Sequence, residues 1–134
     1  MLTHLDLSRT YIGSRVVTIL ADSLQSNCTL TRVDLCGNMI DSSGGVALAK
    51  ALPTNRCLTH LNLRCNRIGA AGATEFVKAL QTNNTLVFLD LRNNGIYVEG
   101  VTKIHGFLCA LSASSCHTLL YDEVPGIQDP RVDF

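Results

Sequence analysis

Leucines and other apolar residues recur along this chain at one fixed spacing. The segment from Leu58 reads L-T-H-L-N-L-R-C-N-R-I, and related copies begin at Leu2, Leu30 and Leu86, each 28 residues from the next. Within each copy, apolar and polar residues alternate over a few positions, which is the period of a short strand with one buried face. A fixed period of this length indicates stacked supersecondary units.

The second half of each copy has apolar residues at helical spacing. In the first copy Gly13 turns the chain, and Val16, Val17, Leu20 and Leu24 recur at this spacing up to about residue 27. Aligned by the period, Leu20 matches Leu48, Phe76 and Ile104, and Leu24 matches Leu52, Leu80 and Leu108. We therefore expect one strand and one helix per repeat, with each helix burying the same face.

Some polar and small residues also keep the period. Ser42 or Ser43 is the expected N-cap of the second helix, which should end before Pro53. The column of Gly44, Gly72 and Gly100 lies near the helix starts, where we expect successive helices to approach closely.

Asparagine occupies one column of the repeat at positions 38, 66 and 94, with Thr10 in the first copy. An amide side chain can donate and accept, so we expect Asn38, Asn66 and Asn94 to be structural and to bond backbone groups where each strand ends. Asn27-Cys28-Thr29 and Asn83-Asn84-Thr85 match the N-glycosylation acceptor pattern, but their shared phase indicates a recurring turn.

The pattern L-x-x-L-x-L-x-x-N-x-I resembles the leucine-rich repeat, and the full copies resemble its ribonuclease-inhibitor-like class. This resemblance implies an α/β fold, a short right-handed solenoid with a concave parallel sheet and convex helices. We expect four repeats over residues 1–112 and an irregular tail over 113–134 that partly caps the last one. In the tail, Ser114 and His117 fall where leucines are due, although Leu119 and Leu120 are candidates for a worn fifth strand.

The first repeat is ordinary in sequence, whereas repeat arrays usually begin with a polar capping unit. Its strand edge is therefore expected to be bare. Two explanations stay open: the chain is a piece of a longer array, which we favour, or it docks this edge on another molecule.

Composition excludes several kinds of partner. The chain has 11 basic and 11 acidic residues among its 134 residues and no net charge, which argues against nucleic acid and anionic membranes. No segment is apolar for long enough to span a bilayer. The first repeat leaves no room for a secretory signal, and the six cysteines lack framework spacing, so we expect reduced thiols and a cytoplasmic location.

Polar residues between the inward leucines should point together from the concave side of the sheet. They form three columns: first His4, Arg32, His60 and Phe88; second Asp6, Asp34, Asn62 and Asp90; third Ser8, Cys36, Arg64 and Arg92. One interpretation is a protein-binding face with an acidic stripe, flanking arginines and one aromatic anchor. The other is that these charges pair with each other and keep the sheet hydrated.

We adopt the binding interpretation for the face as a whole. The residues expected to contact a partner protein are Arg32, Asp34, His60, Asn62, Arg64, Phe88, Asp90 and Arg92.

The sequence contains no motif for catalysis, a cofactor or a small-molecule substrate. His4 and His60 share a column but are two strands apart, about 10 Å, which is too far to bind one metal ion directly. Cys57 with His60, and Cys116 beside His117, lack a second matching pair. We therefore expect no enzyme, no metal and no cofactor.

The resemblance adds functional expectations. The class includes ribonuclease inhibitor, NOD-like receptors, Ran GTPase-activating protein and a leucine-rich subunit of the dynein regulatory complex, and it implies a non-catalytic interaction module or scaffold. The alternatives are a GTPase activator of the Ran type and a structural fragment of a larger repeat protein. Similarity to the dynein regulatory subunit also implies association with the cytoskeleton or axoneme.

Overall fold

The computed structural model describes residues 1–108, 118–122 and 124–126. In these residues strands alternate with helices. The elements are β1 His4–Asp6, α1 Ser14–Ser26, β2 Arg32–Asp34, α2 Ser42–Ala51, β3 His60–Asn62, α3 Gly69–Leu80, β4 Phe88–Asp90, α4 Tyr97–Leu108 and β5 Thr118–Leu120.

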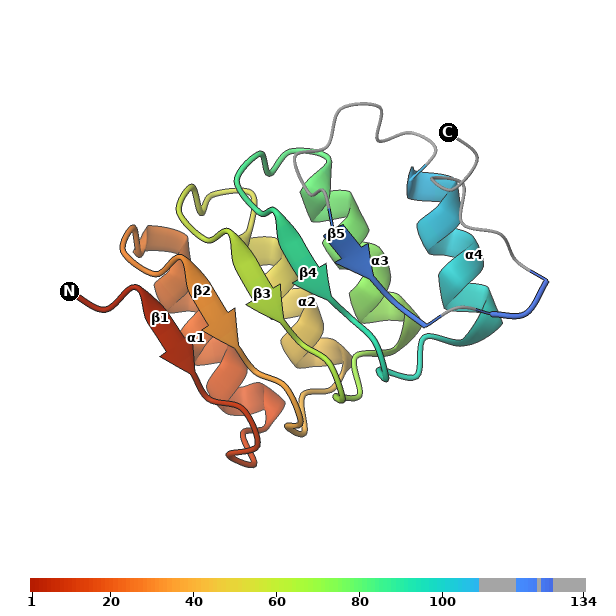
Figure 1. Ribbon diagram of the computed structural model, residues 1–134, viewed down its shortest axis with the longest axis horizontal. Coiled ribbons are helices and arrows are strands. Elements are labelled where there is room, and N and C mark those ends of the chain that lie inside the picture. Colours follow the sequence, from red (N-terminus) through yellow and green to blue (C-terminus); the bar gives the residue numbers. More distant parts are fainter. Residues whose placement is uncertain (109–117, 123, 127–134) are drawn as a thin grey trace.

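The strands form one parallel sheet in the order β1-β2-β3-β4-β5, and the helices lie side by side along one of its faces (Figure 1). Each helix packs on the next one in the chain. The predicted α/β leucine-rich repeat solenoid is therefore confirmed.

The strand register preserves the period of the sequence. His4 pairs with Arg32, Arg32 with His60, and His60 with Phe88, so residues 28 apart are neighbours across the sheet. The last pairing joins Phe88 to Thr118, an offset of 30 residues. The expected fifth strand therefore exists, two residues later than the period would place it.

The core fills the space between sheet and helices. Leu35, Leu63 and Leu91, one from each of three successive strand segments, are completely buried, as is Phe76 of α3. The first repeat is less covered because it has a neighbour on one side only: its core residues Leu5, Leu7, Ile12 and Leu20 are partly buried, while Leu2 and Ile19 are exposed.

The second helix is capped by a different residue from the one predicted. Asp41, not Ser42 or Ser43, is the N-cap of α2, and its carboxylate accepts hydrogen bonds from Ser43 N at 2.8 Å and Gly44 N at 3.4 Å. The Ser14 hydroxyl of the first repeat also donates to Asp41 at 2.6 Å. The Asp41 carboxylate therefore caps the helix of its own repeat and also bonds to the repeat before it. The serines were expected to cap the helix only.

The glycine column permits the close packing that the sequence predicted. A Cβ on Gly100 would lie 3.1 Å from the Cα of Ala70 on the preceding helix and 2.5 Å from Cγ2 of Ile96 in its own repeat. Gly44 approaches the Cα of Ser14 in the same way. The isoleucine contact, which the sequence did not indicate, is the tighter one.

Asparagine side chains connect each repeat to the one before it. The Nδ2 group of Asn66 donates to Leu35 O of the preceding repeat and to Leu63 O of its own repeat, both at 2.9 Å, and Oδ1 accepts from Ile40 N at 3.1 Å. Asn38 and Asn94 make the same pattern of bonds. We call this row the strand-end ladder.

A second row of asparagines lies where each helix returns to the next strand. Asn55 donates to Leu24 O at 2.7 Å and Asn27 O at 3.1 Å, and its Oδ1 accepts from Cys57 N and Leu58 N. Asn83 repeats this arrangement one period later and is only 1% exposed. In this fold the amide of Asn83 is therefore a structural group in a turn. We call the row formed by Asn55 and Asn83 the helix-end ladder.

The proposed division into repeats over 1–112 and a capping tail over 113–134 stays a prediction. Much of the tail lies outside the described residues, including Ser114 and His117. Its described part contributes β5 to the sheet edge, where Leu91 N donates to Leu120 O at 2.7 Å.

Candidate protein-binding face

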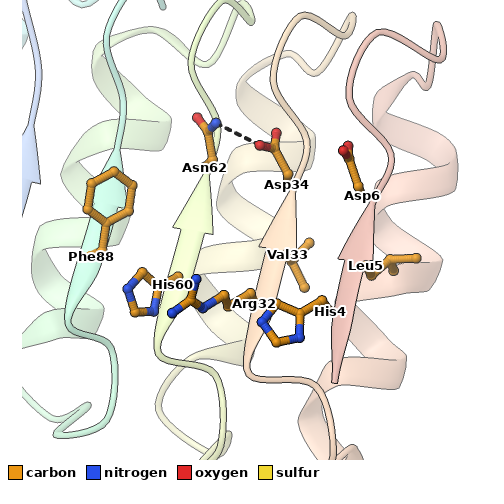
Figure 2. Close-up of a pocket in the computed structure, with 9 residues that line it drawn as sticks. All are labelled: His4, Leu5, Asp6, Arg32, Val33, Asp34, His60, Asn62 and Phe88. Atoms are coloured by element: carbon orange, nitrogen blue, oxygen red, sulfur yellow. Dashed lines mark hydrogen bonds between the residues drawn. The ribbon is translucent and has the colours of Figure 1, made fainter. Parts of the chain in front are cut away.

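The sheet face opposite the helices, called the concave face below, has a depression of about 290 Å³ over β1 to β4. It is lined by His4, Leu5, Asp6, Arg32, Val33, Asp34, His60, Asn62 and Phe88 (Figure 2). Because the residues of one column project from strands about 4.8 Å apart, their side chains form a continuous surface. Arg32, Asp34, His60, Asn62 and Phe88 from the predicted set meet here.

The first column combines aromatic and basic groups. The rings of His60 and Phe88 stack with centroids 5.8 Å apart and planes inclined by 23°. The Thr59 hydroxyl fixes the imidazole of His60 through Nδ1 at 2.9 Å. Burial, followed by the charge of Arg32 and the nearby His4, lowers the pKa of His60 below its ordinary value. This end of the depression therefore has a largely neutral aromatic wall beside one permanent cation.

The second column is acidic at the first two strands. Asp34 accepts a hydrogen bond from Asn62 Nδ2 at 3.0 Å and from Cys36 N at 2.8 Å, so its carboxylate is held in position (Figure 2). Asp6 accepts from Ser8 N at 2.9 Å and is exposed, and bonds from Ser8 lower its pKa. Both carboxylates retain oxygen atoms that can accept a donor from a partner.

Asp90 differs from the expectation. It lies in the second column, but its side chain is only 3% exposed and its carboxylate is bound by the Arg92 guanidinium, with Nη2 to Oδ2 at 2.6 Å and Nε to Oδ1 at 3.0 Å. Asp90 cannot offer these oxygens directly to a partner. It instead fixes Arg92, whose side chain is 41% exposed and whose pKa is raised by the hydrogen bonds and charge of Asp90.

Arg32 and Arg64 are exposed on the same face. In the part of the chain that the structure describes, the ion pairs are Lys78–Glu75, Arg92–Asp90 and Lys103–Glu99, so neither arginine is in one. Their guanidinium groups therefore have donors available for a partner. The interpretation in which charged residues of the face only pair with each other therefore fits Arg92 and Asp90 better than it fits Arg32 and Arg64.

His4 and Asp6 line the depression although the predicted contact set omitted them. They share the columns of Arg32 and Asp34, so the period itself contained the signal that would have included them.

Other chemistry has little support on this face. No cluster of three or more potential metal ligands occurs among the described residues. Cys28, Cys36, Cys57 and Cys65 are free thiols, and burial followed by the neighbouring Cys65 and Asp34 raises the pKa of Cys36. Cys109 and Cys116 lie outside the described residues. None of the described helices is both long and apolar enough to cross a bilayer.

Comparison with known proteins gives two matches. The family model described as "Leucine Rich repeat" matches residues 26–49, 54–77 and 82–104, three segments spaced by the same period. Among solved structures, the Leiomodin-1 Actin-Binding Site 2 is similar, with a TM-score of 0.83 and 23% identity, covering 97% of this chain and 75% of that one. No curated protein matches the sequence. At this identity the structural likeness establishes the fold alone.

Proposed function

Because the chain belongs to the leucine-rich repeat family, we propose that it is a non-catalytic binding module that holds a partner protein on its concave face. The observation that carries this proposal is the depression over β1 to β4, in which aromatic, basic and acidic side chains converge from neighbouring strands. Aromatic and arginine side chains dominate the energetics of protein interfaces, and here they project from neighbouring strands of one sheet.

The two walls of the depression have opposite charge. Arg32 lies beside the stacked rings of His60 and Phe88, whereas Asp6 and Asp34 lie two residues further along their strands, about 7 Å away along the strand. A partner segment with an acidic group for Arg32 and a basic group for Asp34 fits this distribution. An apolar side chain of the same segment, placed two strands further along the sheet, would cover the Phe88 ring.

The experiment is a paired charge reversal. Arg32→Glu with Arg64→Glu should weaken binding of the partner at least about tenfold, since both substitutions replace attraction with repulsion at an exposed surface. The melting temperature should stay nearly unchanged because neither side chain is in an ion pair within the described residues. A partner is first identified by affinity capture and mass spectrometry, and the measured quantity is then its dissociation constant.

The matched control reverses the charges of two exposed lysines on the helices, Lys50 and Lys78, which changes the net charge by the same amount. The control should bind as the original chain does. If both pairs weaken binding equally, the effect is one of net charge and the concave face is not the site. If neither pair does, the proposal is wrong.

Actin is the first candidate partner to test, because the similar solved structure is an actin-binding site of leiomodin-1. Co-sedimentation tests binding of the chain to actin filaments. The fluorescence of pyrene-labelled actin tests binding to actin monomers. We further propose, by the sequence resemblance, that the repeats are of the ribonuclease-inhibitor-like class and that the chain acts at the cytoskeleton. The Ran-type alternative predicts faster phosphate release from a small GTPase on addition of the chain.

A further inference from the structure

A second surface lies at the edge of the sheet where each strand turns into its helix. We call it the loop edge and define it by residues 8–15, 36–42, 64–70 and 92–98, each of which comprises the loop after a strand and the first one or two residues of the following helix, along the lower side of Figure 1. The exposed side chains on it are Arg9, Thr10, Tyr11, Arg15, Met39, Asp41, Arg64, Cys65, Arg67, Asn93, Tyr97 and Val98.

These loops are held together by backbone hydrogen bonds. Met39 N donates to Ile12 O at 3.0 Å and Arg67 N donates to Ile40 O at 2.8 Å. Isolated parallel bridges also join Gly13 to Met39 and Asp41 to Arg67. Side chains at equivalent positions of neighbouring loops, such as Tyr11, Met39 and Arg67, therefore form an ordered row, and binding to an ordered row loses less conformational entropy.

Charge is concentrated on this edge. The four segments contain five arginines and one acidic residue, although the whole chain has equal numbers of basic and acidic residues. Arg92 is paired with Asp90 and Arg64 belongs to the concave set, so Arg9, Arg15 and Arg67 are the cations particular to this edge. That acidic residue, Asp41, is already engaged by the Ser14 and Ser43 hydroxyls, each at 2.6 Å. On the opposite edge, the turns at 25–31, 53–59 and 81–87 contain a single charged residue, Arg56.

The exposed aromatic residues have unusual backbone conformations. Tyr11 has φ of +60° and Tyr97 has φ of +26°, in the region that residues other than glycine rarely adopt. Their side chains are 82% and 81% exposed, so burial of the ring does not compensate for this conformation. Such residues often occur where a surface has a functional role.

From these observations we propose that the loop edge is a second docking surface, for an acidic protein segment that also has apolar side chains. Its carboxylates would pair with Arg9, Arg15 and Arg67, and its apolar groups would cover Tyr11 and Met39. This surface shares Arg64 with the concave set, but Arg9, Arg15 and Arg67 do not line the depression and Arg32 does. The loop edge is therefore tested through Arg9 and Arg67 and the concave face through Arg32, so that the two proposals fail separately. Nucleic acid fits less well, because the chain is neutral overall and the exposed apolar side chains Met39 and Val98 lie on the same edge as the arginines.

The test uses a fluorescein-labelled peptide with the sequence Glu-Leu-Glu-Phe repeated three times, followed by fluorescence anisotropy at two salt concentrations. The peptide should bind, more weakly at the higher salt concentration. Arg9→Glu with Arg67→Glu should weaken binding at least about tenfold, and Tyr11→Ala alone should weaken it severalfold. The same peptide with lysine in place of glutamate should not bind.

Two control variants locate the effect. Lys50→Glu with Arg56→Glu makes the same charge change away from the loop edge, and Arg32→Glu changes the concave face; both should stay within about twofold of the original chain. Circular dichroism checks folding, and Arg9→Gln with Arg67→Gln replaces the double reversal if that variant is unfolded. Absence of peptide binding, an equal loss in the controls, tighter binding of oligothymidine, or a self-association that blocks the peptide would each overturn the proposal.

Discussion

The helix-end ladder allows the hydrogen bonds between repeats to be measured by one pair of substitutions. Asn55 makes four hydrogen bonds with the backbone: two to Leu24 O and Asn27 O of the preceding repeat and two from Cys57 N and Leu58 N of its own. Asn27 occupies the same position in the first repeat, and its Oδ1 likewise accepts two backbone bonds, from Thr29 N at 3.0 Å and Leu30 N at 2.8 Å. It also accepts from the Thr29 hydroxyl, but at 3.4 Å this third bond is long and contributes little. Asn55 therefore differs from Asn27 mainly by the two hydrogen bonds that it donates to the preceding repeat.

The expected costs follow from this difference. With a net value of about 1 kcal/mol for each hydrogen bond, Asn55→Ala should lower the free energy of unfolding by about 4 kcal/mol and Asn27→Ala by about 2 kcal/mol. The difference of about 2 kcal/mol is then the contribution of the two bonds between repeats. It is a lower bound, because Asn55 is 2% exposed and its loss leaves buried carbonyls unpaired.

Urea denaturation followed by circular dichroism measures both variants, with Asn84→Ala, an exposed neighbour of the ladder, as the neutral control. Costs of Asn55→Ala and Asn27→Ala that agree within about 0.5 kcal/mol, well below the 2 kcal/mol expected for two bonds, would refute the reasoning. The conclusion would then be that the ladder orders the turns but does not connect the repeats.

Three further predictions concern the packing and the titrating groups. Gly72→Ala should lower the free energy of unfolding by about 2 kcal/mol in the same denaturation assay, since the new Cβ would lie 2.4 Å from Cγ2 of Ile68. Hydroxyl and backbone hydrogen bonds lower the pKa of Asp41 from 3.8 to about 2, so the unfolded chain binds the proton more readily. The stability due to Asp41 is complete above about pH 4 and is lost as the pH falls toward 2. The melting temperature of the Asp41→Asn variant should therefore depend less on pH over this range. Arg32→Ala should raise the pKa of His60 in an NMR titration, because the arginine charge helps to keep that pKa low; an unchanged value would mean that burial and the nearby His4 lower it without Arg32.

The sequence was sufficient to predict the repeat, its register and the composition of the concave columns. The 28-residue spacing required His4, Arg32, His60 and Phe88 to become neighbours, and the sheet pairs them in this way. A local period translates directly into such contacts because each repeat touches only the next one.

Features that depend on one side chain reaching another were not predictable from the period. The burial of Asp90 depends on Arg92 folding back over it, which a column of alternating charges does not specify. The capping of α2 by Asp41 had a local signal, since aspartate is a favoured N-cap residue, but its bond to Ser14 one repeat away had none. The helix-end ladder had a visible signal, since asparagine recurs at 27, 55 and 83, but its hydrogen bonds to the preceding repeat appear only in three dimensions.

The two asparagine ladders also make the repeats interchangeable. Each amide reaches a backbone carbonyl of the preceding repeat, 31 residues earlier, and Leu7 O, Leu35 O and Leu63 O are equivalent acceptors for Asn38, Asn66 and Asn94. Duplication or excision of a whole 28-residue unit would join the remaining units with every acceptor still in place. A deletion of one or two residues would instead disconnect both rows at that boundary, so length in such an array can change in whole units far more easily than in fractions of them.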